Sequence, residues 1–316
     1  MTTSQRIDVQ SSAMAPAVAA PRTAQARALR NLLVAVPYLL PSLIIFTFFV
    51  FVPLLKTINL SLYLTNPIGL PVEFTGLDNY KDALSDETVF NSLKVSLTFA
   101  LYVVPTTLIF ALFLAVLANS PLRGVSVFRV IFASTIAVSG ATASLIFLFL
   151  FHPAIGVFNY ILDLLHQPRV AWLTSEATAL ISVSLVTIWL TLGFNTVIFL
   201  AGLQGIPQEL YESARIDGAG FWSSFRHITI PMISPTIFFL IVVSTLGALQ
   251  TFTQVNIMTR GGPVESTQVI VHLIYRAFYF NGQYGVAATL SVLLFLIMFV
   301  LTIIQFGVLE RRVHYG

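Results

Sequence analysis

The polar run from Gln204 to Pro235 places carboxylates, basic side chains, glycine and proline between two apolar stretches. Glu209 and Glu212 fall in or near the first two turns of a predicted helix, where carboxylates oppose the positive end of the helix dipole. Pro207 suits the first position of a helix, and Gly218 ends the helical pattern. The run therefore predicts a short helix with one partly apolar and one charged face. Such a helix either docks on a partner protein or lies on lipid headgroups.

Three amide side chains, those of Asn195, Gln250 and Gln254, fall inside apolar stretches. A buried amide needs a hydrogen-bond partner in lipid. Gln250 and Gln254 are four residues apart and would share one face of a helix, where they could line a wet cavity for a polyhydroxylated neutral ligand. The alternative is that these amides hold neighbouring helices together, the role we assign to the serine and threonine hydroxyls of the same stretches.

The sequence contains few residues that could carry out covalent catalysis. The chain has no cysteine, and its histidines fall in predicted loops or tails, namely His152, His166, His227, His272 and His314. No phosphate-binding loop of the type Gly-x-x-x-x-Gly-Lys-Ser/Thr is present. We therefore expect no catalytic residues, no metal site and no nucleotide site in this chain.

The amino-acid composition indicates that membrane-spanning helices position the amide and carboxylate side chains described above. With 57% hydrophobic and 9% charged residues, the chain is too apolar to form a water-compatible surface and is predicted to be an all-α integral membrane protein. Six apolar runs are long enough to cross a bilayer about 30 Å thick. They are Leu32–Leu55, Val95–Ala118, Val130–Phe151, Thr178–Leu203, Ser234–Asn256 and Val286–Val308.

The distribution of basic residues predicts the orientation. Residues 1–30 are predicted to be a disordered tail, and residues 31–316 one membrane domain. An even number of spans puts both ends on one side. The tail, the Gln204–Pro235 run and the other segments of that side carry ten of the 16 lysines and arginines, so both termini are predicted to be cytoplasmic.

The spacing within the polar run resembles a known motif. Glu212-Ser213-Ala214, then Gly218, then Ile228-Thr229-Ile230-Pro231 follow the pattern Glu-Ala-Ala, three residues, Gly, nine residues, Ile-x-Leu-Pro. This pattern is similar to the cytoplasmic coupling loop of the membrane subunits of binding-protein-dependent ABC importers. Ser213 stands in place of alanine and Ile230 in place of leucine.

Other segments resemble the carbohydrate-uptake branch of the same family, and the resemblance covers about Leu32 to Tyr315. They are Phe74–Tyr80, Thr259–Pro263 and Gly285–Ser291. The closing Gln305–Phe306 and Val313–Tyr315 are similar to the glycerol-3-phosphate branch. The resemblance implies a sugar or related polyol as the solute, with glycerol-3-phosphate or a glycerophosphodiester as the alternative.

The resemblance also implies a fold, partners and residue roles. The fold is the six-helix core of type I importers, with a coupling helix between the fourth and fifth spans. The partners are a second membrane subunit of similar fold, two ATPase subunits that bind ATP and Mg²⁺, an extracytoplasmic solute-binding protein and the lipid of a prokaryotic inner membrane, with no nucleic acid. The residues expected to couple the spans to the ATPase are Glu212, Ser213, Ala214, Asp217, Gly218, Ile228 and Pro231.

Two other classes of protein remain as alternatives. An ATP-independent secondary carrier would be expected to contain ionisable residues within its spans or a repeated pair of broken helices, and the six runs contain no Lys, Arg, Asp, Glu or His. A membrane enzyme would need a group of catalytic side chains at depth. Neither class accounts for the motif around Glu212.

Overall fold

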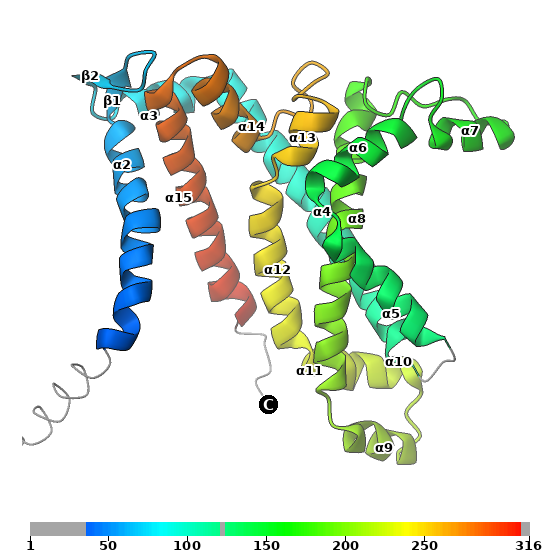
Figure 1. The fold of residues 1–316 in the computed structure, drawn as a ribbon. Helices are drawn as coiled ribbons and strands as arrows, with labels where there is room; N and C mark the ends of the chain where they lie inside the picture. Colours follow the sequence, from blue (N-terminus) through cyan, green and yellow to red (C-terminus); the bar gives the residue numbers. More distant parts are fainter. Residues whose placement is uncertain (1–35, 121–123, 311–316) are drawn as a thin grey trace, which may run out of the picture. The chain divides into compact units, whose positions relative to one another are not determined.

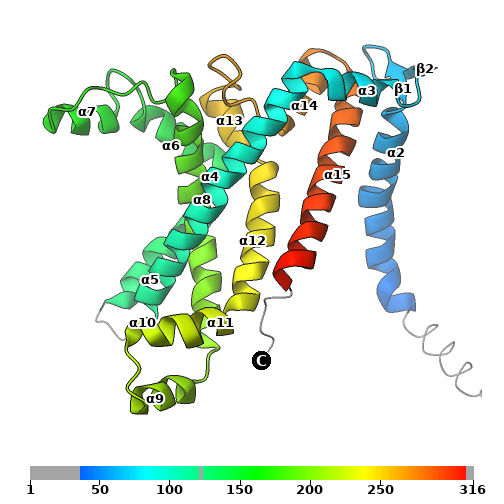
Figure 2. The same ribbon diagram turned by 180° about the vertical axis from the view of Figure 1, so that it is seen from behind.

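The computed structural model describes residues 36–120 and 124–310 (Figures 1 and 2). The predicted tail, residues 1–30, and Arg311 and Arg312 lie outside the described residues. The chain divides into two compact units, residues 1–56 and 57–316, and each is described by itself.

The described part of the first unit belongs to one apolar helix, Val36–Leu60, which is 25 residues long and continues past the predicted end at Leu55. A π-helical turn, η1 (Thr47–Phe51), precedes the last part of this helix, α2 (Val52–Leu60). Pro53 follows this turn and has no N–H with which to continue the regular hydrogen-bond ladder, so the change of pitch falls where the chain has a proline. No residue of this helix is buried.

The second unit is built on two long helices, α4 (Glu87–Ala118) and α8 (Glu176–Gln204), which pack along each other. Asp86 caps α4 by accepting a hydrogen bond from the N–H of Thr88. Fully buried alanines on α4, Ala111 and Ala115, allow the backbones to approach closely. The helix α12 (Ser234–Leu249) packs on α4, and α15 (Tyr284–Leu309) packs on α12.

The predicted third span is not one straight helix. Its two parts are Val125–Ala137, made of α5 (Val125–Ser134) and η2 (Thr135–Ala137), and α6 (Gly140–Leu150), and they meet at an angle of 104°. The hydroxyl of Ser139 accepts a hydrogen bond from the N–H of Thr142 at 3.1 Å and so begins a new helix. The predicted third span, Val130–Phe151, is therefore present as a bent pair of helices.

The fifth span is interrupted near its end. The helix α12 stops at Leu249, and α13 (Thr253–Met258) follows after Gln250–Phe252. Gln250 therefore lies in the interruption and Gln254 lies on α13, so the expectation that they share one helical face is wrong. The spans still match the predicted class: five helices are long and apolar enough to cross a membrane, and the bent pair makes six.

Shorter elements lie at the two ends of the second unit (Figures 1 and 2). One end, here called the α9 end, carries α9 (Gln208–Ile216), α10 (Phe221–Ser224), η3 (Phe225–Thr229) and α11 (Ile230–Met232). The opposite end, called the α13 end, carries the antiparallel pair β1 (Tyr63–Thr65) and β2 (Pro71–Phe74), α3 (Asp78–Ser85), α7 (Val157–Leu164), α13, α14 (Ile270–Tyr275) and η4 (Arg276–Phe280).

Candidate functional site

The predicted coupling helix is present as α9. Pro207 immediately precedes it as the N-cap instead of occupying its first position, and Gly218 ends the turn with φ +78°, in the left-handed region that glycine favours. No residue of α9 is buried. One side-chain hydrogen bond, between the hydroxyls of Tyr211 and Thr229 at 2.9 Å, holds α9 against η3. The helix is thus formed by local signals and only lightly attached.

The motif residues of α9 present an open polar surface. Glu212, Ser213, Asp217 and Gly218 are exposed, and Ala214 is half-buried. Among the described residues Glu212 has no ion-pair partner. On the return segment, Ile228 is half-buried in η3 and packs on the hydrophobic core, and Pro231 lies in the first turn of α11.

A cavity of about 520 Å³ lies between α9 and the ends of the long helices. Its lining includes Glu212 and Arg215 from α9, Asn119 at the end of α4 and Leu203 near the end of α8. A partner side chain seated there would therefore contact α9 and two spans together.

Two features of the α9 end were not predicted. Arg129 of α5 donates two hydrogen bonds, at 2.6 and 3.2 Å, to the carbonyl of Ala118, where the negative end of the α4 dipole lies. Phe221, Trp222 and Phe225 form a cluster with ring centroids 5.5 to 6.0 Å apart, and Trp222 is 76% exposed. Three aromatic residues in an otherwise polar run were the available signal for this cluster.

The three predicted path residues occupy different environments. Asn195 is buried; its Nδ2 donates to the carbonyl of Thr191 at 2.8 Å, and its Oδ1 accepts from Ser244 of α12 at 3.2 Å. This geometry supports the packing alternative for Asn195. Gln250 is exposed at the interruption after α12, whereas Gln254 is half-buried on α13.

The two interruptions in the spans lie next to each other. A Cβ placed on Gly140, at the start of α6, would lie 3.5 Å from Nε2 of Gln254 and 3.9 Å from Cγ2 of Thr253. Helix ends leave backbone groups unpaired, and in membrane proteins such irregular backbone occurs where protein or water can satisfy it. Gln250 lies in one interruption, and the side chain of Gln254 lies beside the start of α6 at the other.

A larger cavity, of about 860 Å³, lies at the α13 end between α6, α13, α14 and η4. Its apolar walls include Leu145 and Leu148. Its polar lining consists of Asn256, Arg260, His272, Tyr275, Arg276 and Asn281. No local pattern in the sequence predicts this cavity, because its residues come from segments that are distant in the chain.

His272 corrects the expectation that the histidines lie in solvated loops. It belongs to α14 and is only 3% exposed. Its Nδ1 lies 2.8 Å from Oε1 of Gln268, an oxygen that can only accept, so Nδ1 carries the proton. Burial, and secondarily the charge of Arg276, lowers the pKa of His272 below its usual range, so the ring is neutral at pH 7.

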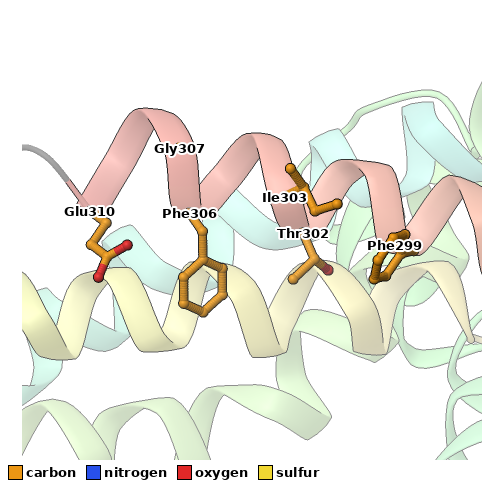
Figure 3. A pocket seen from close by; sticks show the side chains of 6 residues that line it. All are labelled: Phe299, Thr302, Ile303, Phe306, Gly307 and Glu310. Atoms are coloured by element: carbon orange, nitrogen blue, oxygen red, sulfur yellow. The ribbon is translucent and has the colours of Figure 1, made fainter.

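A third hollow follows the last turns of α15 and is mostly apolar (Figure 3). Phe299, Ile303 and Phe306 line it, with Thr302 and, at its end, Glu310. It offers few polar contacts for a hydrophilic solute. Across all described residues, no group of three or more His, Cys, Asp or Glu side chains could hold a metal ion.

With this geometry in view, the chain can be placed among known proteins. It matches the family of binding-protein-dependent transport system inner membrane components over residues 89–315 and belongs to this family. It is a multi-pass inner membrane protein and the permease subunit of an ABC importer. Nucleotide is handled by partner ATPase subunits, and the family depends on a solute-binding protein.

Its curated relatives include proteins named sn-glycerol-3-phosphate transport system permease protein UgpA. The protein from Agrobacterium fabrum is 37% identical over 285 residues, which cover 89% of this chain and 96% of the relative. The protein from Yersinia pestis bv. Antiqua (strain Antiqua) is 36% identical over 284 residues, covering 88% and 95%.

Solved structures show the same fold. A chain of the bacterial alginate ABC transporter, crystallised with a periplasmic protein bound to an alginate pentasaccharide, aligns with a TM-score of 0.80 at 22% identity, covering 92% of this chain and 98% of that one. A chain of a bacterial ABC transporter involved in alginate import aligns with a TM-score of 0.77 at 24% identity, covering 92% and 99%.

Proposed function

We propose that this permease carries a small polyhydroxylated solute, a sugar or a polyol derivative, and that α9 transmits the movement of the ATPase to the spans. In this proposal residues 31–316 act as one permease domain after a tail of residues 1–30. Both termini and α9 lie on the cytoplasmic side. The chain pairs with a second permease subunit of similar fold, two ATPase subunits and an extracytoplasmic solute-binding protein.

The observation that carries the coupling role is the geometry of α9. Its polar residues are exposed, its one side-chain tether is at Tyr211, and the cavity behind Glu212 reaches the ends of α4 and α8. A lever must make contacts with its driver that differ between the driver's two states. Glu212 is the polar anchor in this proposal, Ala214 permits close approach, and Asp217 and Gly218 make the turn. Ser213 and Ile228 complete the motif, and Pro231 stiffens the return to the fifth span.

For the solute, glycerol-3-phosphate or a glycerophosphodiester is the second candidate beside a neutral sugar. The names of the UgpA relatives favour it, as do Arg260 and Arg276 in the lining of the larger cavity. Gln250 and Gln254 are the proposed path residues. Asn195 is the third proposed path residue. Its side chain already hydrogen-bonds Thr191 of α8 and Ser244 of α12, so we propose that it holds these two helices together beside the path.

The test of coupling is ATP hydrolysis by the complete complex in proteoliposomes, with the solute-binding protein and its ligand added outside. Glu212→Ala is expected to abolish most of the ligand-stimulated hydrolysis while the complex still assembles. Glu209→Ala is the matched control, because Glu209 is an exposed carboxylate on the same helix that does not line the cavity. Equal loss in both variants, or uptake by this chain without ATP hydrolysis, would contradict the proposal.

A further inference from the structure

The charged residues that line the larger cavity at the α13 end are all positive. Two arginines, Arg260 and Arg276, contribute to its lining, and no carboxylate does. Glu265 is the nearest recorded acidic partner, with Oε1 3.7 Å from Nη1 of Arg276, and both side chains are more than 40% exposed. An exposed pair at this distance neutralises the arginine weakly. Arg260 has no ion-pair partner among the described residues.

The backbone around Arg260 is held by the protein itself. Arg260 has φ +51°, a left-handed conformation that is unfavourable for a residue with a Cβ. Its N–H donates to the carbonyl of Val255 at 2.8 Å, and the hydroxyls of Thr259 and Thr267 hydrogen-bond at 2.7 Å beside it. These contacts fix the point from which the guanidinium extends. A guanidinium on a fixed backbone loses less conformational entropy when it binds an anion.

The rest of the lining fits a small polyol attached to the anionic group. Asn256, Tyr275 and Asn281 can exchange hydrogen bonds with hydroxyls, and apolar side chains from α6 close one side. Neutral His272 adds a ring nitrogen, Nε2, that can accept a hydrogen bond. The volume of about 860 Å³ is in the range of small-molecule sites.

We propose that this cavity is an anion-binding site in which Arg260 and Arg276 hold the phosphate or carboxylate of a small hydroxylated solute before it enters the path near Gln254. The inference rests on the proposed uptake of a polyhydroxylated solute and adds to it the charge of the solute and the residues that select it. Arg260 and Arg276 are the specificity-determining residues, and the hydroxyl-binding residues are shared with any neutral polyol.

The test is direct binding to the purified complete complex without the solute-binding protein. Three probes share one carbon skeleton: sn-glycerol-3-phosphate, glycerate and glycerol. The two anions are expected to bind at least about tenfold more tightly than glycerol, with affinity falling as salt rises. A preference between the two anions identifies the group as phosphate or carboxylate. Equal binding of all three probes would overturn the proposal.

Substitutions locate the site. Arg260→Gln and Arg276→Gln are each expected to weaken sn-glycerol-3-phosphate binding by on the order of tenfold and to leave glycerol binding unchanged. Arg169→Gln is the matched control, because Arg169 lies in the segment after α7 and is paired with Asp163 at 2.7 Å. Loss of binding in Arg169→Gln as large as in the other two variants, or loss in neither cavity variant, would contradict the assignment.

The same variants distinguish three possibilities: an anion site, an importer without such a site, and arginines that contact the solute-binding protein. If binding protein and ligand stimulate ATP hydrolysis but the anions bind no better than glycerol, the anion site fails and the importer function stands. If no ligand-loaded binding protein stimulates hydrolysis, the importer function fails, and with it the role of the site in uptake. If both arginine substitutions reduce stimulation without changing probe binding, the arginines contact the binding protein and the anion site is wrong.

Discussion

The α13 end holds several buried polar groups in hydrogen bonds, whereas α9 leaves its polar groups exposed. Two side-chain atoms of the α13 end, Gln268 Nε2 and Ser266 Oγ, are buried without a hydrogen-bond partner. At the α13 end, Ser96 accepts a hydrogen bond from the N–H of Ile270 at 2.8 Å, and Gln268 pairs with His272, all of them buried. Every ion pair of the described residues lies on this side of the second unit. At the α9 end, α9 has one side-chain hydrogen bond to the rest of the described chain and no buried residue.

This difference separates an end with a packed polar interior from a helix, α9, whose polar side chains can contact a partner. Buried polar groups that are hydrogen-bonded help to make a segment rigid. A helix with few buried contacts has low local stability and can move without unfolding its neighbours. The α13 end is therefore built as a fixed frame, and α9 as an element whose missing contacts come from a partner.

Substitution of two glycines with similar backbone angles tests whether the α13 end is more tightly packed than the α9 end. Gly261 has φ +87°, and a Cβ there would overlap Oε1 of Gln268 and lie 3.1 Å from Nδ1 of His272. Gly261→Ala adds backbone strain of about 1–2 kcal/mol, because the left-handed conformation is unfavourable for alanine. It also displaces Gln268 from its buried hydrogen bond with His272, which costs about 1–3 kcal/mol. We expect the thermal midpoint of the purified complex to fall by several degrees, with ATP hydrolysis lost in proportion.

Gly218→Ala is the control for this substitution. Gly218 has φ +78°, and a Cβ there would meet nothing within 4 Å. Only the backbone strain remains, about 1–2 kcal/mol, and it falls on a lightly attached helix. Equal losses of thermal stability in the two variants would show that the α13 end is no more tightly packed than the α9 end.

The tether of α9 should affect coupling more than stability. Tyr211→Phe removes the hydroxyl that bonds Thr229, a loss of about 0.5–1.5 kcal/mol. We expect ligand-stimulated ATP hydrolysis to fall severalfold and the thermal midpoint to stay nearly constant. Thr229→Val should have the same effect on hydrolysis, and the double variant should add little. Additive losses would mean that the two hydroxyls act separately.

The smallest expected effect is a dependence on pH. The pKa of His272 is lowered by burial and by Arg276, so the unfolded chain binds a proton at a higher pH than the folded chain does. The stabilising contribution of the neutral ring is present above pH 6.5 and is lost as the pH falls below it. His272→Gln should flatten the fall in thermal midpoint between pH 7 and pH 5, whereas His227→Gln, at an exposed position, should not. An unchanged pH profile in His272→Gln would count against a buried neutral ring.

Local signals predicted the α9 region well. Pro207 lies one residue before α9 and Gly218 two residues after it, because each acts through its own backbone. The approximate positions of the spans follow from the length of the apolar runs. The interruptions were not predictable in the same way. Ser139 and Gly140 lie in an apolar run that masks the capping signal, and no glycine or proline marks the interruption at Gln250–Phe252. The burial of His272 depends on Gly261 and Gln268, and no local pattern encodes such tertiary packing.

The bend between η2 and α6 also bears on how the protein is made. The helix α5 has 10 residues and α6 has 11, and each is well below the roughly 20 residues with which a helix crosses the bilayer alone. A Cβ on Gly193 of α8 would overlap the carbonyl oxygen of Phe132, so α5 depends on a helix that is synthesised after it. The third span is thus expected to depend on α8, a helix synthesised after it, for its stability in the bilayer.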